Sequence, residues 1–161
     1  IIRVVLNLSS VLNGLSQAFM GTAGLIGGII AGVIANKFKT NKIYWLFWIM
    51  GISIAVFGIV LLLDLSANLT YIIFVIIGIV IFISANIAGI FIMSAIQQNV
   101  PNDMLGRIMS FYSAIVSIAL PIGILFYGYL YERFINHLPA IMFFTAIAIL
   151  GIGYILSLIH I

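Results

Sequence analysis

Residues 71–96 read YIIFVIIGIVIFISANIAGIFIMSAI and contain no charged side chain. A helix rises about 1.5 Å per residue, so about 20 apolar residues cross the ~30 Å hydrocarbon core of a bilayer. Only a helix satisfies its own backbone hydrogen bonds within lipid. This stretch is therefore predicted to be a transmembrane helix, and it decides the fold class.

Four further runs without a charged residue lie on either side of this stretch. They are residues 14–35, 43–63, 108–130 and 138–159. None has the alternating polar residues of a membrane β-barrel strand. The sequence therefore predicts an all-α membrane protein with five transmembrane helices.

The composition excludes the common soluble classes. Of 161 residues, 65% are apolar and 6% charged, against about 45–50% and about 25% in soluble domains. Six basic and three acidic residues are too few for the clustered basic face that binds nucleic acid. The chain has no cysteine, which removes disulfides and thiolate metal sites.

The basic residues predict an orientation, because cytoplasmic loops carry the excess of Lys and Arg. The cytoplasmic set is Lys37, Lys39, Lys42 and Arg107, and the outer set is Arg3 and Arg133. Aromatic residues at the expected helix ends resemble interfacial belts. These are Tyr44, Trp45 and Trp48 at the inner side, and Tyr127, Tyr129 and Tyr131 at the outer side. The C-terminus is then expected inside.

Polar side chains are concentrated in the first, third and fourth runs, and such residues usually face a bundle interior or a wet cavity. We expect these three helices to be interior and the second and fifth to face lipid. The candidate cavity residues are Gln17, Ser84, Asn86, Tyr112, Ser113 and Ser117. The amide of Asn86 cannot satisfy its donor and its acceptor from its own helix backbone. It is expected either to bond across helices or to line a cavity.

Glycine and proline mark two helices as special. Gly24, Gly28 and Gly32 recur every four residues, so another helix can approach closely, either as a static packing face or as a sliding contact. Pro121 with Gly123 falls inside the fourth run. Proline removes a backbone hydrogen bond there, which predicts a kink or a hinge.

No catalytic or metal-binding constellation is present, so we expect neither an enzyme nor a cofactor. Asp64, Asp103 and Glu132 lie in three different loops, which prevents an acid and base pair from assembling. His137 and His160 have no partner at ligand spacing. No ionisable residue lies deep in a span.

Residues 32–42, GVIANKFKTNK, resemble the basic loop between helices two and three, or eight and nine, of the major facilitator superfamily. The family pattern is Gly, three residues, Asp, a basic residue, one residue, Gly, then further basic residues. Gly32, Lys37 and Lys42 match it, whereas Asn36 replaces the acid and Lys39 the second glycine.

A second and more specific resemblance covers residues 99–110, NVPNDMLGRIMS, and continues through residues 119–123, ALPIG. It is similar to the loop before the eleventh helix in drug and macrolide efflux members, with Pro101, Gly106 and Arg107 as the matching positions. From the residues alone, Pro101, Asn102 and Asp103 predict a helix stop followed by a cap.

The resemblance implies that residues 1–161 are helices eight to twelve of a twelve-helix permease of a bacterial inner membrane. Such a protein transports by alternating access. The implied partners are the lipid bilayer, a missing N-terminal half, a small lipophilic substrate, and protons coupled through residues not present here. Residues 156–161, LSLIHI, also resemble translated adapter sequence. The alternatives are a complete, non-transporting five-helix membrane subunit and, less favoured by the residues, an intramembrane enzyme.

Overall fold

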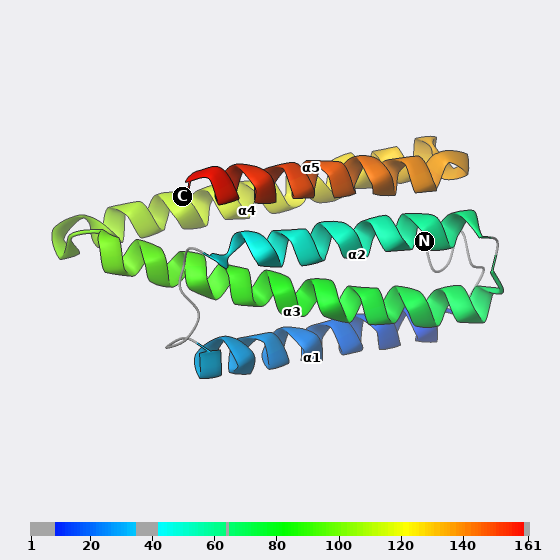
Figure 1. Cartoon of the computed structure of the whole chain (residues 1–161), viewed down its shortest axis with the longest axis horizontal. Coiled ribbons are helices and arrows are strands. Elements are labelled where there is room, and N and C mark those ends of the chain that lie inside the picture. The colour runs from blue at the N-terminus through cyan, green and yellow to red at the C-terminus, as the bar shows by residue number, and fades with distance from the viewer. Residues whose placement is uncertain (1–8, 35–41, 64, 160–161) are drawn as a thin grey trace.

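The computed structural model describes residues 9–34, 42–63 and 65–159. Its five long helices are α1 (Ser10–Ile34), α2 (Tyr44–Leu62), α3 (Ala67–Asn99), α4 (Asn102–Arg133) and α5 (Leu138–Ile159), and the short 3-10 helix η2 (Ile135–His137) precedes α5 (Figure 1). All five are long and apolar enough to cross a bilayer, and the described residues form no strand. The prediction of an all-α, multi-pass membrane protein is confirmed.

The α3–α4 connection is shorter than the sequence suggests. The polar residues from 97 to 107 are predicted as a loop, but only Val100 and Pro101 separate the two helices. Val100 is extended, with φ −101° and ψ 130°, as expected for a residue before proline. The predicted stop is therefore correct. No side chain caps α4; instead the carbonyl oxygen of Pro101 accepts from the backbone N–H groups of Met104 and Leu105.

Because the polar residues stay helical, α3 and α4 have 33 and 32 residues. Each is about 50 Å long at about 1.5 Å per residue, well beyond the ~30 Å hydrocarbon core. Figure 1 shows their joined ends extending past the other helices. Asp103 lies in the first turn of α4, where a negative charge interacts favourably with the helix dipole.

The helices pack as a row in the order α1, α3, α2, α5 (Figure 1). Contacts along the row show that α1 runs parallel to α3, since Leu12 meets Tyr71 at one end and Gly28 meets Ile90 toward the other. An apolar cluster joins α1, the start of α2 and α3. Its buried members are Ala31, Ile43, Leu46, Ile87, Ala88 and Phe91.

Burial differs from the expectation based on polar residues. The second and fifth helices were expected at the periphery, yet α2 lies between α3 and α5 and packs closely against both. Conversely, α4 contains no buried residue. The helices α2 and α5 pack through apolar side chains and glycines, which the distribution of polar residues does not report.

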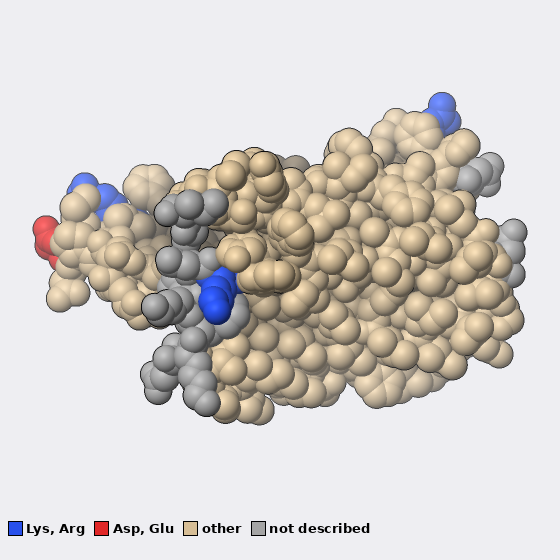
Figure 2. Space-filling model, viewed as in Figure 1, with Lys and Arg blue, Asp and Glu red and all other residues tan. Residues whose placement is uncertain are grey.

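Among the described residues, charged side chains lie only at the two ends of the bundle. Lys42 and Arg107 lie at the end where α2 and α4 begin, and Glu132 and Arg133 lie at the opposite end. Between the ends, the face shown in Figure 2 is free of charged side chains. This uncharged belt is what a lipid environment requires. Lys37 and Lys39 lie outside the described residues.

The orientation can be tested with single cysteines, because the native chain has none. In intact cells, a membrane-impermeant maleimide is expected to label Glu132→Cys and to leave Arg107→Cys unlabelled until the cells are permeabilised. Lys42→Cys should behave like Arg107→Cys, since both begin helices at the same end. The reverse pattern would contradict the orientation, and labelling of all three would contradict the five crossings.

Candidate functional site

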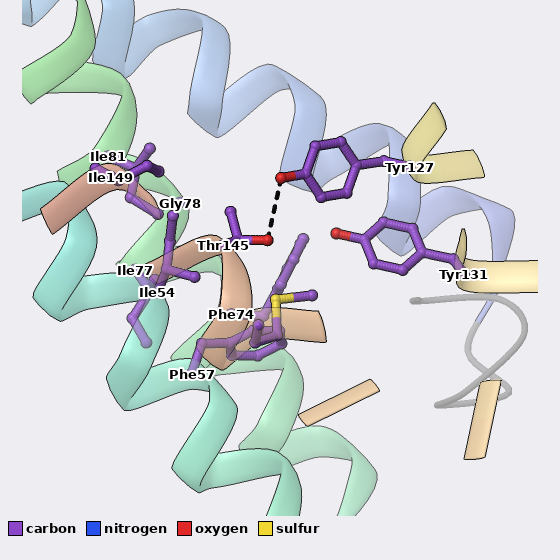
Figure 3. Close-up of a pocket in the computed structure, with 11 residues that line it drawn as sticks. Ile54, Phe57, Phe74, Ile77, Gly78, Ile81, Tyr127, Tyr131, Thr145 and Ile149 are labelled. Carbon is purple, nitrogen blue, oxygen red and sulfur yellow. Dashed lines mark hydrogen bonds between the residues drawn. The ribbon is translucent and has the colours of Figure 1, made fainter. Parts of the chain in front are cut away.

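A cavity of about 380 Å³ lies where α2, α3, α4 and α5 meet (Figure 3). None of its lining residues is charged, and eight are apolar or glycine. Three carry hydroxyl groups: Tyr127 and Tyr131 from α4, and Thr145 from α5. An apolar concavity with a few convergent polar groups is the usual form of a small-molecule site.

The hydrogen bonds of Thr145 and Tyr127 show which hydroxyl group donates and which accepts. Thr145 Oγ1 donates to the carbonyl oxygen of Ile141 at 2.8 Å. A threonine hydroxyl has a single hydrogen, so across the 3.1 Å separation Tyr127 Oη is the donor and Thr145 Oγ1 the acceptor (Figure 3). This bond connects the C-terminal half of α4 to α5.

The second tyrosine has a different role. The Tyr131 ring stacks obliquely beside Tyr127, with ring centroids 5.8 Å apart. Figure 3 shows its hydroxyl directed into the same space as Thr145. No described residue forms a hydrogen bond with Tyr131 Oη. The cavity therefore presents one hydroxyl donor that no described protein group uses.

The opposite wall of the cavity is apolar and well packed. The rings of Phe57 on α2 and Phe74 on α3 lie 5.4 Å apart between centroids. Phe57 is 4% exposed and Met142 7% exposed. Gly78 leaves space that Met20 of α1 approaches. These residues belong to α1, α2, α3 and α5, so packing between four helices sets the shape of this side of the cavity.

The six predicted cavity residues do not line this cavity. Ser84 is buried within α3, Tyr112 is half-buried, and the other four are exposed on their helices: Gln17 on α1, Asn86 on α3, and Ser113 and Ser117 on α4. The structure does not gather them into one pocket. Their assignment to a substrate cavity stays a prediction.

Asn86 behaves only partly as expected. Its Nδ2 donates to the carbonyl oxygen of Phe82 at 2.9 Å, within its own helix. No hydrogen bond to another helix forms among the described residues, and the side chain is exposed. It lies against α1, because a Cβ at Gly24 would be 3.2 Å from Asn86 Nδ2. The exposed side chain of Asn86 fits the second alternative, a place on the wall of a cavity.

Of the predicted glycine repeat on α1, only Gly24 lies close to another helix, and the tightest approach is at the neighbouring Gly27. A Cβ at Gly27 would lie 2.9 Å from the carbonyl oxygen of Ile83, and one at Gly24 would lie 3.2 Å from the side-chain Nδ2 of Asn86. Gly28 makes only ordinary contact, at 4.0 Å from Ile90, and Gly32 has no neighbour within 4 Å. Small residues let two backbones approach in this way within membranes.

The sequence interpretation missed a second close contact formed at glycines, the one between α2 and α5. A Cβ at Gly51 would lie 2.6 Å from Leu150, and one at Gly153 would lie 2.6 Å from Trp48. Gly58 similarly faces Met142. The detectable signal was the spacing of seven between Gly51 and Gly58, which places both on one helix face.

The predicted loop and hinge residues are only partly described. Asn36 and Lys37 lie outside the described residues, whereas the other members of the loop motifs are exposed. Those members are Gly32, Lys42, Pro101, Gly106 and Arg107. The helix α4 continues through Pro121, and nothing lies within 4 Å of a Cβ at Gly123. The proline therefore does not end the helix.

Ionisable groups form no further site in the described part of the chain. Asp103 and Glu132 lie at opposite ends of α4, and no group of three or more potential metal ligands occurs among the described residues. Asp64 and His160 lie outside them.

Comparison of the chain with protein-family models, with curated proteins and with solved structures finds no match.

Proposed function

We propose that this chain forms helices eight to twelve of a secondary transporter of the major facilitator superfamily, of the drug or macrolide efflux type. Two six-helix halves of such a transporter rock around a binding site near the bilayer midplane. The observation that carries the proposal is the open polar face of α4. This long membrane helix has no buried residue.

The open face of α4 bears regularly spaced hydroxyl groups. Ser110, Ser113 and Ser117 recur at helical spacing, and all three are exposed. Ser110 Oγ bonds to the carbonyl oxygen of Gly106. Polar groups within a bilayer usually face a bundle interior or a water-filled cavity rather than lipid. This face is therefore suited to form one wall of a cavity that further helices complete.

The two loop motifs support the same proposal. Lys42 ends one motif and Arg107 belongs to the other, and both lie at the same end of the bundle. The resemblance requires this, because both loops are cytoplasmic in the family. In the proposed transporter, α1, α3 and α4 contribute to the central cavity.

The proposal also assigns what must come from elsewhere in the transporter. Among the described residues, no Asp, Glu, Lys, Arg or His lies in the middle of a helix. Proton coupling needs such an ionisable group within the membrane. The coupling residue is therefore assigned to the other half of the permease. A bacterial inner membrane and a small lipophilic substrate complete the proposal.

Asn86→Leu tests this function in the full-length transporter. The leucine removes an exposed amide from the middle of α3, and losing a hydrogen bond of about 1–2 kcal/mol to substrate or water in the cavity lowers export about 5- to 30-fold. The measurement is drug efflux from cells that express equal amounts of each variant.

Asn99→Leu is the matched control. Asn99 is also exposed and also donates from Nδ2 to a backbone carbonyl four residues earlier, that of Ala95, at 2.8 Å. It lies at the end of α3 rather than in the middle, so its export should equal that of the native transporter. Unchanged export of every substrate by Asn86→Leu would remove Asn86 from the site, and loss of export by both variants would indicate a helix defect.

A further inference from the structure

The cavity between α2, α3, α4 and α5 has no role in the proposed transport mechanism. None of the six candidate substrate residues lines it. Its volume of about 380 Å³ falls within the range of about 300–1,000 Å³ that is typical of small-molecule sites. All of its lining residues belong to these four helices, so the lining does not require the other half of a permease.

The wall chemistry restricts the ligand to neutral molecules. Every lining residue is uncharged, and the wall formed by Phe57, Phe74 and Met142 is apolar. A charged ligand placed against such a wall loses its hydration without gaining a partner. A lipophilic body, by contrast, matches the wall by shape and by dispersion contacts.

The hydrogen bonds among the three hydroxyl groups then indicate which polar group the ligand carries. The hydrogen of Thr145 is used by the carbonyl oxygen of Ile141, and that of Tyr127 by Thr145. Tyr131 is left with a hydroxyl hydrogen that no described protein group accepts. Since an unused donor beside an apolar cavity favours an acceptor on the ligand, a carbonyl or ether oxygen fits this position.

We propose that this cavity binds a neutral lipophilic molecule carrying one hydrogen-bond acceptor, which accepts from Tyr131 Oη. The proposal does not rest on transport, because a non-transporting subunit with these helices has the same cavity. Two sources supply this chemistry: a free small molecule, and the ester-linked acyl chain of a membrane lipid. The experiment distinguishes them.

Benzophenone is a suitable probe, because it is neutral and lipophilic, has one carbonyl acceptor, and inserts into nearby C–H bonds on illumination. The purified protein is labelled in detergent and in phosphatidylcholine nanodiscs, and the adducts are located by mass spectrometry. The expected adducts lie on cavity residues, Met142 among them. Fluorenone, which keeps the carbonyl, should compete better than diphenylmethane, which lacks it.

Tyr131→Phe keeps the ring and removes the donor, so labelling should fall about 2- to 10-fold. Tyr129→Phe is the matched control: Tyr129 is 64% exposed and does not line this cavity, so its labelling should not change. Ile77→Trp fills the cavity from α3 and should abolish the adducts. Monodisperse elution of each variant in size-exclusion chromatography shows that it is folded.

The outcomes separate cleanly. Cavity labelling that persists in nanodiscs supports the site with a free small molecule as ligand, whereas labelling in detergent that phosphatidylcholine suppresses supports it with a lipid acyl ester as ligand. Adducts only on the outer apolar surface would overturn the proposal. Equal labelling of Tyr131→Phe and Tyr129→Phe would overturn it as well. Neither overturning result affects the efflux test of Asn86, which is made at a different place.

Discussion

Gly27→Leu is expected to force α1 away from α3 and to cause one of the largest losses of stability available in this chain. A Cβ at Gly27 would lie 2.9 Å from the carbonyl oxygen of Ile83 and 3.2 Å from its Cα. These are backbone atoms of α3, which cannot rotate aside as a side chain can. Overpacking costs about 1–3 kcal/mol and occasionally more, and this contact is at the severe end.

The measurement is the temperature at which the purified protein loses its monodisperse peak in mild detergent. At about 2–4 °C per kcal/mol for a chain of this size, Gly27→Leu should lower Tm by about 5 °C or more. Gly21→Leu is the matched control. Gly21 lies on the same helix, nothing lies within 4 Å of a Cβ at this position, and both substitutions improve helix propensity equally. Equal losses in the two variants would disprove the tight α1–α3 seam.

Gly51→Leu is expected to disrupt the α2–α5 pair in a way that a second substitution repairs. A Cβ at Gly51 would lie 2.6 Å from Leu150 Cγ and 3.3 Å from the carbonyl oxygen of Ala146. In a bilayer, helices associate by such packing rather than by the hydrophobic effect. The single variant should therefore lose about 1–3 kcal/mol.

The double variant Gly51→Leu with Leu150→Gly exchanges the protruding side chain and the gap that receives it. It should recover more than half of the lost Tm, although both single variants are less stable than the native protein. Gly151→Leu on α5, next to Leu150, is the control, because nothing lies within 4 Å of a Cβ at Gly151. Purely additive losses in the double variant would show that Gly51 and Leu150 do not pack against each other.

The positions of the helices were predictable, because lipid imposes a length and a composition on each span. The predicted runs at 43–63 and 138–159 match α2 and α5 within one residue at each end. Boundaries fail where polar residues remain helical, as at Gln97 and Gln98 in α3. Hydropathy marks where lipid ends, whereas the helix ends only where Pro101 intervenes.

Helix pairing was predictable only where small residues form an obvious pattern. The repeat around Gly24 predicted a close neighbour for α1, and α3 occupies that place. The α2–α5 pair depends on single glycines that receive Leu150 and Trp48. Which helix supplies the complementary side chain is a property of three-dimensional packing, which the sequence of one helix does not encode.

The four-helix cavity was invisible in the sequence for a related reason. Tyr127, Tyr129 and Tyr131 were interpreted together as an interfacial belt. At about 100° per residue, alternate residues on a helix point in different directions. Tyr129 is exposed accordingly, while Tyr127 and Tyr131, four residues apart, share the face that lines the cavity. The spacing of four between Tyr127 and Tyr131 could have grouped these two, but only the position of Thr145 on α5 reveals what they face.

The order of helices in the row has a consequence for biosynthesis. Membrane helices insert first and associate afterwards, and α2 ends at Leu62 whereas its partner α5 ends at Ile159. At about 5–20 residues per second, roughly 100 residues of synthesis separate the two by about 5–20 s. During this interval the groove at Gly51 and Gly58 is open to lipid or to a chaperone. The α2–α5 pair therefore forms only after α5 has been synthesised, and a ribosome that stalls before α5 leaves α2 without its principal partner.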